Sequence, residues 1–322
     1  MYSLEVLVDN KNGTVWDMPV SSVEWITGRI GKIGTLNVEL IVEEPLLYPI
    51  NNGDIIRVID EGHKVFYGYV VEVGIKKSGV VTVKAYDQLR YMKTTDIYVL
   101  PSSTATVAIR SIAKKLEMKV GTLEDTGYKV PGIVEEDKEA FDVVSKFLDS
   151  SLIATNRNYV LFDDFGSLAL KNINNMAIPA DTFYIGEGSL LFDFDYKKSI
   201  DKETFNHVKL VQDNKETGKR EVYIVQDSAN IAKWGLLQEY RKVDEKMKAA
   251  QIKDLADKML KLRNRETKTL SLDCLGDWRV RAGCLVYIYI EKIGIKEYFL
   301  VDDCTQKSAG GVRTMSLKVK VI

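Results

Sequence analysis

The sequence predicts a mainly β fold with an α+β insert: two small β-barrels, an inserted domain between them, and a long helix flanking the second barrel. The first observation behind this prediction is a repeated pattern. Two segments carry it: GDIIRVIDEGHKVFYGYVVEV (Gly53 to Val73) and GCLVYIYIEKIGIKEYFLVDDC (Gly283 to Cys304). Each opens with glycine, alternates apolar and polar residues, turns at a charged glycine-containing stretch and resumes as an aromatic-rich run. Because such alternation is typical of half-buried strands, the chain is expected to build one β unit twice.

The second observation is a change of hydrophobic period between the two units. Residues 101–180 contain two stretches with helical spacing, whereas alternating runs dominate 1–100 and 181–322. A further amphipathic stretch lies at 246–263. The predicted domains are therefore a first barrel at 1–100, an α+β insert at 101–180, and a second barrel at 181–322 with helix 246–263 on its outside.

The strands of the first barrel are predicted where short alternating runs are separated by glycine turns. These runs are residues 35–44, 55–59, 65–73 and 80–85. The stretch YDQLRYMKTT, residues 86–95, follows and is expected to close the unit as a short helix or turn.

The insert is predicted to hold two helices and two strands. The first helix lies in STATVAIRSIAKKLEM, where Ser103 or Thr104 is placed to cap its start. The second lies in DKEAFDVVSKFLDSSL, behind a cap at Asp137. The strands YVLFDD and SLALKN follow, separated by a turn at Phe165 and Gly166.

The second barrel is assigned four further alternating runs: LLFDFDYKKS, FNHVKLVQDN, REVYIVQD and the C-terminal GGVRTMSLKVKVI. Helix 246–263 places Ile252, Ala256 and Met259 on one side and charged residues on the other. We expect its apolar side to be buried against this barrel.

The composition argues against several classes of protein. The 45 basic and 46 acidic residues of the 322-residue chain nearly cancel, so bulk charge favours neither nucleic acid nor an anionic membrane. No apolar run approaches the roughly 20 residues that span a bilayer, and MYSLEVLVDNKNG lacks the features of a signal peptide, so folding in a cytoplasm is expected. With widely spaced Cys274, Cys284 and Cys304 and two histidines, no disulfide framework, metal site or cofactor is predicted.

Two motifs that look like binding sites are interpreted as ordinary structure. GRIGKIG, at 28–34, is followed by a strand instead of the helix that a phosphate loop needs, so a turn is predicted. The acidic pairs at Asp163 and Asp164 and at Asp302 and Asp303 do not converge, because adjacent strand residues point to opposite faces. We interpret both pairs as solvated strand ends.

Nucleophilic catalysis has no better support. His63 and His207 lie in turn and strand contexts without a GxSxG or Cys-His signature, and the cysteines are interpreted as small buried apolar residues. The scattered tryptophans Trp16, Trp25, Trp234 and Trp278 are explained by packing. No catalytic, cofactor-binding or metal-binding residue is therefore predicted.

A family resemblance rests on several segments in order. They are PVSSVEWITGRIGKIGTLNVELIVEE, GDIIRVIDEGHKVFYGYVVEV, VKAYDQLRYMKTTDIYV, TATVAIRSIAKKL, DTGYKVP and GGVRTMSLKVKV. Together they resemble the baseplate hub proteins of contractile phage tails and of phage-like particles such as tailocins, in their XkdQ-type and tail-protein-D-like forms. The resemblance covers most of the chain, and it is the joint order of the motifs that carries it.

The resemblance implies a structural protein instead of an enzyme. In that family two barrels of the tail-tube type sit in one subunit, and a homotrimer adapts the hexameric tube above to the trimeric spike below. Tape-measure, LysM-type and wedge baseplate proteins are the further partners that it implies, with assembly in the bacterial cytoplasm and a final place in an extracellular particle. Neither a membrane nor sequence-specific nucleic acid is implied. Tyr86, Asp87 and Arg90 are candidates for residues near such contacts.

Two alternatives stay open at this point. A tail-associated peptidoglycan hydrolase would need a catalytic set within the insert, whose acids Glu135, Glu136, Asp137, Glu139 and Asp142 cluster around a helix start instead. A cell-surface carbohydrate-binding module would need an exposed aromatic stripe.

Overall fold

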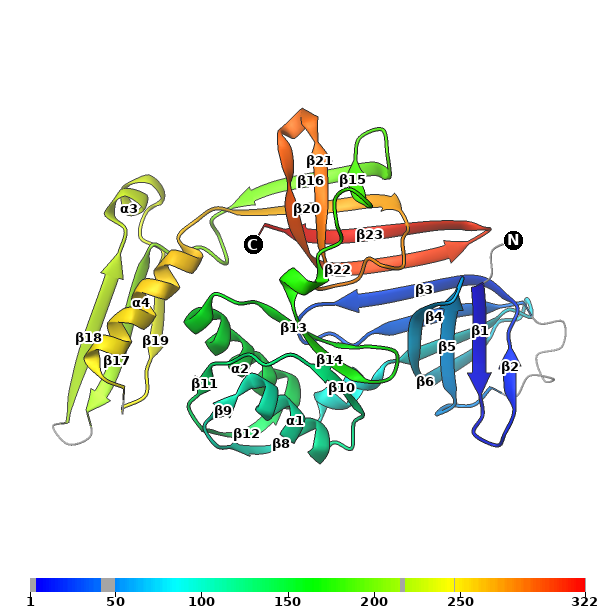
Figure 1. The fold of residues 1–322 in the computed structure, drawn as a ribbon, viewed down its shortest axis with the longest axis horizontal. Coiled ribbons are helices and arrows are strands. Elements are labelled where there is room, and N and C mark those ends of the chain that lie inside the picture. Colours follow the sequence, from blue (N-terminus) through cyan, green and yellow to red (C-terminus); the bar gives the residue numbers. More distant parts are fainter. Residues whose placement is uncertain (1–3, 42–49, 215–217, 246, 322) are drawn as a thin grey trace.

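The largest element of the fold is one continuous sheet of 13 strands that joins the two ends of the chain (Figure 1). The structure, a computed structural model, describes residues 4–41, 50–214, 218–245 and 247–321. The first part of the sheet consists of β1 (Leu4–Asp9), β2 (Val15–Asp17), β3 (Val20–Gly28), β4 (Thr35–Leu40), β5 (Ile55–Asp60), β6 (His63–Ile75) and β7 (Val81–Tyr86). The second part consists of β15 (Tyr184–Gly186), β16 (Leu191–Ser199), β20 (Thr267–Leu275), β21 (Leu285–Ile290), β22 (Ile295–Ala309) and β23 (Val312–Lys320). The short 3-10 helix η4 (Glu291–Ile293) turns the chain between β21 and β22.

The two parts meet at one antiparallel ladder, which we call the seam. It pairs β22 with β3, from Asp303 opposite Gly28 to Ala309 opposite Ser22. Each part curls around its own core, with Trp25 and Ile56 in the first and Leu272 and Phe299 in the second.

The prediction of a mainly β fold is confirmed, but that of two barrels is not: the described strands form no closed barrel. The reason lies in the use of a strand edge. The outer edge of β3, which a closed first barrel would need for its own last strand, bonds β22 of the other part instead.

The strand order of the first part repeats in the second. The order β3-β4-β7-β6-β5 corresponds to β16-β20-β23-β22-β21. The next neighbours differ, because β1 is antiparallel to β5 whereas β15 is parallel to β21. The repeated pattern in the sequence is therefore a repeat of topology.

The two parts also share their irregularities. Gly53 and Gly283, which open the two repeated segments, have φ angles of 93° and 95°. Their N–H groups donate to Val70 and Val301 respectively, both at 2.8 Å. Positive φ at this turn favours glycine, which explains why both segments begin with that residue.

Two β-bulges are common to both parts as well. The register of β3 against β4 shifts between Val20 and Ser22, and that of β16 against β20 shifts between Leu191 and Asp193. The register of β6 against β7 shifts between Val70 and Glu72, and that of β22 against β23 shifts between Val301 and Asp303. Bulges are specific structural features, so these shared positions fix which residues of the two parts correspond.

The insert lies beneath the main sheet in Figure 1 and has its own core, which includes Ile109, Phe147 and Leu168. Its helices are η2 (Gln88–Lys93), α1 (Ala105–Lys115), α2 (Ala140–Thr155) and η3 (Ile173–Met176). Its strands are β8 (Thr95–Leu100), β9 (Ser103–Thr104), β10 (Val120–Leu123), β11 (Lys129–Val130), β12 (Ile133–Glu139), β13 (Tyr159–Asp163) and β14 (Leu168–Asn172). β8 pairs with β12, so it lies with the insert, and the division of the chain at residues 100 and 180 stays a proposal.

The predicted helix caps in the insert are half right. Thr104 caps α1, because its hydroxyl accepts a hydrogen bond from Val107 N at 3.3 Å. The prediction of a cap at Asp137 is wrong, since the N-cap of α2 is Glu139. Asp137 lies instead at the irregularity between β12 and β8, with φ of 53°.

A separate module, which we call the side module, lies at the left of Figure 1. It consists of β17 (His207–Asn214), β18 (Lys219–Gln226), α3 (Ser228–Trp234), β19 (Gln238–Lys242) and α4 (Ala249–Arg263). The strands form their own sheet in the order β18-β17-β19. The module is inserted in the hairpin β16–β20, whose strands part after Ser199 and rejoin at Thr267.

The prediction that the long helix covers the second barrel is therefore wrong. The apolar side of α4, with Ile252 and Met259, is buried against Val208 and Leu210 of β17. The predicted amphipathic pattern is present in α4. Such a pattern does not identify the sheet against which the apolar side of a helix packs, and here that sheet contains β17 and β18 instead of the strands of the main sheet. The predicted helix start at Lys246 and the end of the predicted strand 35–44 lie outside the described residues.

Candidate assembly surface

One end of the seam is held by two ion pairs that bring together motifs treated separately in the sequence. Arg29 Nε donates to Asp302 Oδ1 at 2.7 Å, and Lys32 Nζ lies 2.5 Å from Asp303 Oδ1. The turn predicted in GRIGKIG is present, since this segment connects β3 to β4. The interpretation of Asp302 and Asp303 as solvated strand ends is wrong, because both lie inside β22 at its bulge and bind cations of the turn.

The other end of the seam is held by a buried carboxylate. Asp60, at the turn between β5 and β6, is 1% exposed. Trp278 Nε1 donates to its Oδ2 at 2.5 Å, and Arg313 Nη1 lies 3.1 Å from the same oxygen. Trp278 and Arg313 belong to the second part, so a charge of the first part is neutralised only when the two parts are joined.

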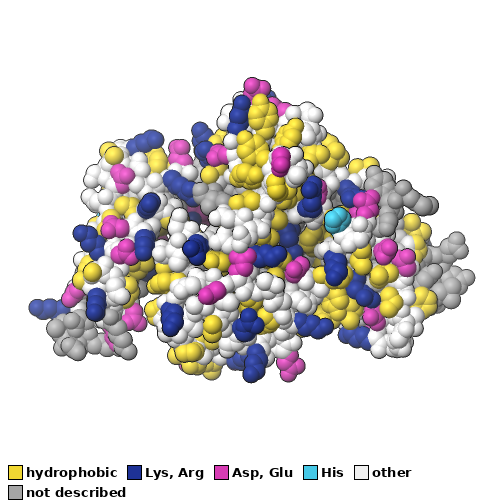
Figure 2. Space-filling view, viewed as in Figure 1, with side chains coloured by type: hydrophobic (Ala, Val, Ile, Leu, Met, Phe, Trp, Pro, Cys, Tyr) yellow, Lys and Arg dark blue, Asp and Glu magenta, His cyan; other side chains and the backbone are white. Residues whose placement is uncertain are grey.

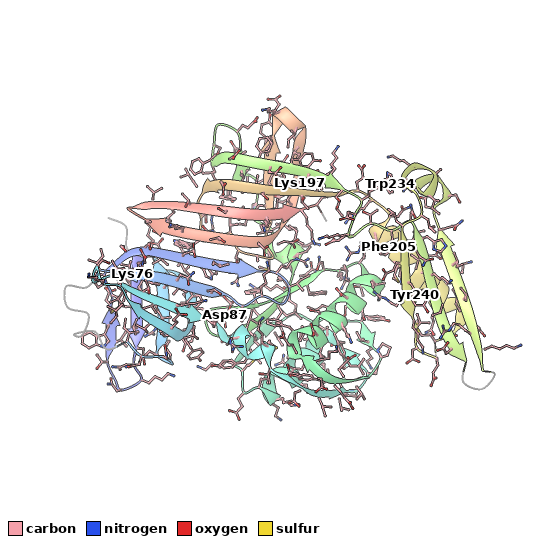
Figure 3. All side chains as sticks on the ribbon, turned by 180° about the vertical axis from the view of Figure 1, so that it is seen from behind. Lys76, Asp87, Lys197, Phe205, Trp234 and Tyr240 are labelled. Carbon is pink, nitrogen blue, oxygen red and sulfur yellow. The ribbon has the colours of Figure 1, made fainter. Side chains whose placement is uncertain are left out.

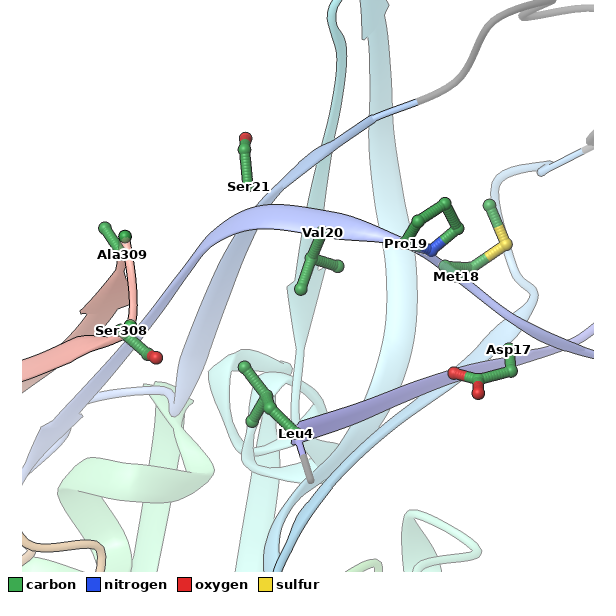
Figure 4. Close-up of a pocket in the computed structure, with 10 residues that line it drawn as sticks. Leu4, Asp17, Met18, Pro19, Val20, Ser21, Ser308 and Ala309 are labelled. Carbon is green, nitrogen blue, oxygen red and sulfur yellow. The ribbon is translucent and has the colours of Figure 1, made fainter. Parts of the chain in front are cut away.

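A small pocket of about 430 Å³ marks the point where the ladder of the seam ends (Figure 4). Leu4 and Val20 line it from the first part, and Ser308 and Ala309 from the second.

The first part, the second part and the insert meet at Arg281. Its guanidinium lies 5.5 Å from the ring centre of Trp25 in β3 and 4.2 Å from that of Phe162 in β13. Its Nη1 donates to the backbone oxygen of Asp163 at 3.0 Å. Stacking of a guanidinium on aromatic faces is favourable, and more so away from water. Arg281 therefore fixes the insert behind the seam.

Two buried carboxyl groups accompany this arginine. Asp87, where the main sheet meets the insert (Figure 3), accepts hydrogen bonds from Gly34 N and Leu89 N, both at 3.0 Å. Burial, followed by the charge of Asp163, raises the pKa of Asp87 well above its usual range, and Arg281 acts in the opposite direction. Burial also raises the pKa of Asp163 to about 6, opposed by the hydrogen bond from Gly166 N.

The interpretation of Asp163 as a solvated strand end is therefore wrong, although its neighbour Asp164 is exposed. Raised pKa values are common in catalytic sites, but they also arise in structural clusters. Asp87 and Asp163 are only 5% and 6% exposed, so they are not open to a substrate. Their geometry is that of a structural junction.

The face of the main sheet opposite the two cores is polar and continuous across the seam. Glu24 of β3 lies opposite Lys307 of β22 on one side and Asn37 of β4 on the other. The row continues through Lys84 of β7 to Glu72 of β6. Basic and acidic residues thus alternate along the row, and Asn37 Nδ2 donates to Glu24 Oε1 at 2.9 Å.

We call this face the polar face and regard it as the candidate assembly surface. Figure 2, which shows one side of the molecule, shows basic and acidic side chains interspersed among hydrophobic ones. A sheet with one apolar and one polar face can wall a water-filled space or meet a hydrated partner, because its outer side chains need no apolar cover. Interspersed charges attract neither sign strongly.

The other residues considered in the sequence are not brought into one site. Tyr86 lies on the polar face opposite Tyr69, Arg90 is exposed, and Asp87 is buried. His63 is exposed at the start of β6, whereas His207 is 8% exposed in the side module. Sequence reasoning missed Arg281, whose only signal is a basic residue two positions before the repeated glycine of the second unit.

The remaining candidates from the sequence are the cysteines and the acidic cluster of the insert. The three cysteines are free and buried, and burial raises the pKa of Cys274 to about 12, which removes its nucleophilic form at neutral pH. Among the described residues, no group of three or more His, Cys, Asp or Glu side chains could hold a metal ion. Glu135 of the acidic cluster in the insert lies 2.6 Å from Lys146 Nζ in an ion pair. In the same described ranges of the chain, no helix is both long and apolar enough to cross a bilayer.

Comparison with known proteins gives a consistent result. The family model described as YqbQ-like matches residues 23–320. The chain is 26% identical over 275 residues to the uncharacterized protein YqbQ of Bacillus subtilis, and 27% identical over 275 residues to the phage-like element PBSX protein XkdQ of the same organism. Each match covers 84% of this chain and 82% of the relative.

A solved structure shows the same fold. The 43 kDa tail protein of prophage MuSo2 from Shewanella oneidensis matches with a TM-score of 0.70 at 14% identity, over 98% of each chain. At this identity the likeness concerns the fold.

Proposed function

The chain belongs to the YqbQ-like family, and on that premise we propose that it is a structural hub protein in the baseplate of a phage-derived tail. Three copies form a ring that presents six like β units to the tail tube. The same ring keeps three-fold symmetry for the spike on its other side.

The observation that carries this proposal is the repeated unit joined by the seam. Its two copies share a strand order, a glycine turn and two β-bulges, and they are tied by a ladder, ion pairs and a buried carboxylate. A chain that holds two like units in fixed relation has a use where six-fold and three-fold symmetry meet, because three such chains supply six units.

The relatives support a place in a tail. XkdQ is a protein of a phage-like element, and the Shewanella protein is a prophage tail protein. The tail tube above and the spike below are the proposed main partners, with tape-measure, LysM-type and wedge baseplate proteins around them. Assembly takes place in the bacterial cytoplasm, and the finished particle acts outside the cell.

The polar face walls the axial channel in this proposal, and the insert projects outward. Alternating charges suit a channel wall, because a passing chain of either charge meets no strong attraction along it. The buried junction at Arg281 holds the insert against the other side of the seam, away from the lumen.

A reconstruction of the particle's baseplate by electron cryomicroscopy, without imposed symmetry, tests the proposal. We expect three copies of the chain around the axis and six β units in one ring. Six copies of the chain, or inserts that block the lumen, would overturn it. Incubation of the purified protein with cell-wall sacculi tests the hydrolase alternative, and we expect their turbidity to stay constant.

A further inference from the structure

One strand edge of the repeated unit is paired with another strand in the second part but is open in the first. β22 pairs with β21 along its first half, and its second half pairs with both β23 and β3. The corresponding strand β6 pairs with β5 along its first half, but from Glu72 onward its described partner is β7 alone. The edge that receives β3 in the second part is thus free in the first, among the residues that the structure describes.

A second open edge corresponds to β3 itself. β16 occupies the place of β3 in the repeat, and it ends the main sheet. Its partner among the described residues is β20. The molecule therefore has two halves of a second seam, one on β6 and one on β16.

One chain does not bring these two edges together. Figure 3 labels Lys76, directly after β6, and Lys197 on β16, and the two lie well apart in the molecule. The same relation is therefore possible only between two chains.

We propose that the free edge of β6 in one copy pairs with β16 of a second copy, in the register that β22 and β3 use within the chain. The shared bulges fix this register: Glu72 corresponds to Asp303, and Ser199 corresponds to Gly28. The new ladder therefore places Glu72 opposite Ser199, Gly74 opposite Lys197, and Lys76 opposite Asp195. This inference rests on the ring proposed above and names the strands that close it.

The side chains of the two edges are complementary in this register. Lys76 meets Asp195, as Lys307 meets Glu24 at the seam. At the bulge, where the seam has the ion pair of Asp302 and Arg29, the corresponding residues are Val71 and Ile200. A charged pair is thus replaced by an apolar pair, so both contacts remain matched.

Exposure of apolar side chains agrees with a surface that becomes covered. Val71 is 38% exposed and Ile75 62% exposed on β6, and Phe192 is 61% exposed on β16. An open strand edge with apolar residues invites pairing, and charges on such an edge usually prevent it. In the proposed register one charged pair meets, Lys76 and Asp195, which within the chain lie in ion pairs with Glu39 and Lys197. Their opposite signs favour this register over one that opposes like charges.

Disulfide trapping with Glu72→Cys and Ser199→Cys in one chain tests the ladder. At the seam, Arg29 N donates to Asp302 O at 2.9 Å, so the next pair, Asp303 and Gly28, is not hydrogen-bonded. Residues in such a pair have Cα atoms about 4.5 Å apart, a distance that a disulfide spans. The chain's own cysteines are buried and do not compete.

The matched control combines Glu72→Cys with Lys197→Cys, which is out of register by two residues on the same face. A second control, Thr305→Cys with Ile26→Cys, lies opposite within the seam and should close inside one chain. We expect the in-register pair to give covalent trimers on non-reducing gels, about tenfold faster than the out-of-register pair, whose Cα atoms are too far apart to bond without strain. A mixture of the Glu72→Cys chain with the Ser199→Cys chain should give covalent dimers and no larger covalent species, because each chain then carries only one cysteine of the pair.

The possible outcomes separate the ladder from the ring. Equal linkage of the in-register and out-of-register pairs, or no linkage of either, overturns the ladder, even if native mass spectrometry finds trimers. Specific linkage that yields open polymers or larger rings supports the ladder and overturns the three-copy ring. Covalent trimers support both.

Discussion

Arg281 Nη1 donates a hydrogen bond to the backbone oxygen of Asp163 at 3.0 Å, so a side chain of the second part reaches the insert behind the seam. Its guanidinium is held between the rings of Trp25 and Phe162. This one side chain therefore connects the first part, the insert and the second part of the chain.

Arg281→Ala should reduce the free energy of unfolding by about 3–5 kcal/mol, the cost of breaking a buried charge cluster. The stacked contacts are lost, and Asp87 and Asp163 lose a compensating charge. Denaturant titration measures the loss. Arg90→Ala, at an exposed position, should change stability by less than about 0.5 kcal/mol. A similar small effect at both positions would contradict the structural role of Arg281.

The contribution of Asp163 to the stability of the protein should fall as pH rises from about 4 to about 6. The pKa of Asp163 is raised from 3.8 to about 6 in the folded chain, so the folded state holds this proton where the unfolded state has released it. Each step of rising pH through this window therefore favours unfolding, up to about 3 kcal/mol in total. The buried Asp87 acts in the same direction.

Asp163→Asn isolates this effect, because an amide keeps the acceptor for Gly166 N and does not titrate. The variant should be more stable than the parent above pH 6 and should lose less stability between pH 4 and pH 6, as followed by denaturant midpoints. An unchanged slope in the variant would assign the pH dependence to other groups.

Gly283→Ala should destabilise the chain more than Gly53→Ala, although the two φ angles differ by only 2°. A side chain at either position costs about 1–2 kcal/mol because the backbone is left-handed. At Gly53 the added Cβ meets open space, whereas at Gly283 it lies 2.8 Å from Val160 Cγ1. Denaturant titration of both variants measures the difference, and equal losses would show that the insert yields at Val160.

Trp278→Phe should cost about 1–3 kcal/mol, because it removes a donor from the carboxylate of Asp60, which is 1% exposed. The aromatic character is kept, so packing near Trp25 changes little. Trp234→Phe, in the side module (Figure 3), is the control, and we expect no measurable change. Equal effects would mean that the hydrogen bond to Asp60 adds nothing to the seam.

The repeated unit could be predicted from the sequence because its signals are local. Alternation shows half-buried strands, and the glycines that open both segments are required by positive φ at Gly53 and Gly283. The cap at Thr104 is local in the same sense.

The seam and the side module could not be predicted, because they depend on which edges and faces meet. The sequences of β3 and β22 contain no signal that these two strands pair with each other instead of closing two separate barrels. The strands β17 and β18 alternate like the others, and alternation shows that one face is buried but not against what. The burial of Asp87 and Asp163 is likewise a tertiary property, visible only once Arg281 lies beside them.

The apolar pair proposed between chains can be converted into the ion pair of the seam. Val71→Asp alone places an unpaired charge against Ile200 of the neighbouring copy. Added to the chain that carries Glu72→Cys and Ser199→Cys, it should lower the yield of covalent trimers about tenfold, as expected for an uncompensated charge in an interface. Ile200→Arg alone should do the same. The double variant reproduces the ion pair of the seam, in which Arg29 Nε lies 2.7 Å from Asp302 Oδ1. It should therefore restore most of the yield.

The two substitutions lie on the separate open edges, β6 and the end of β16, so a rescue within one chain is not expected. Denaturant titration of each variant checks that the monomer remains folded. If each single change lowers the yield and the double change lowers it further, the two positions do not meet and the register is wrong. If the double change restores it, Val71 of one copy lies against Ile200 of the next, as the repeat of topology requires.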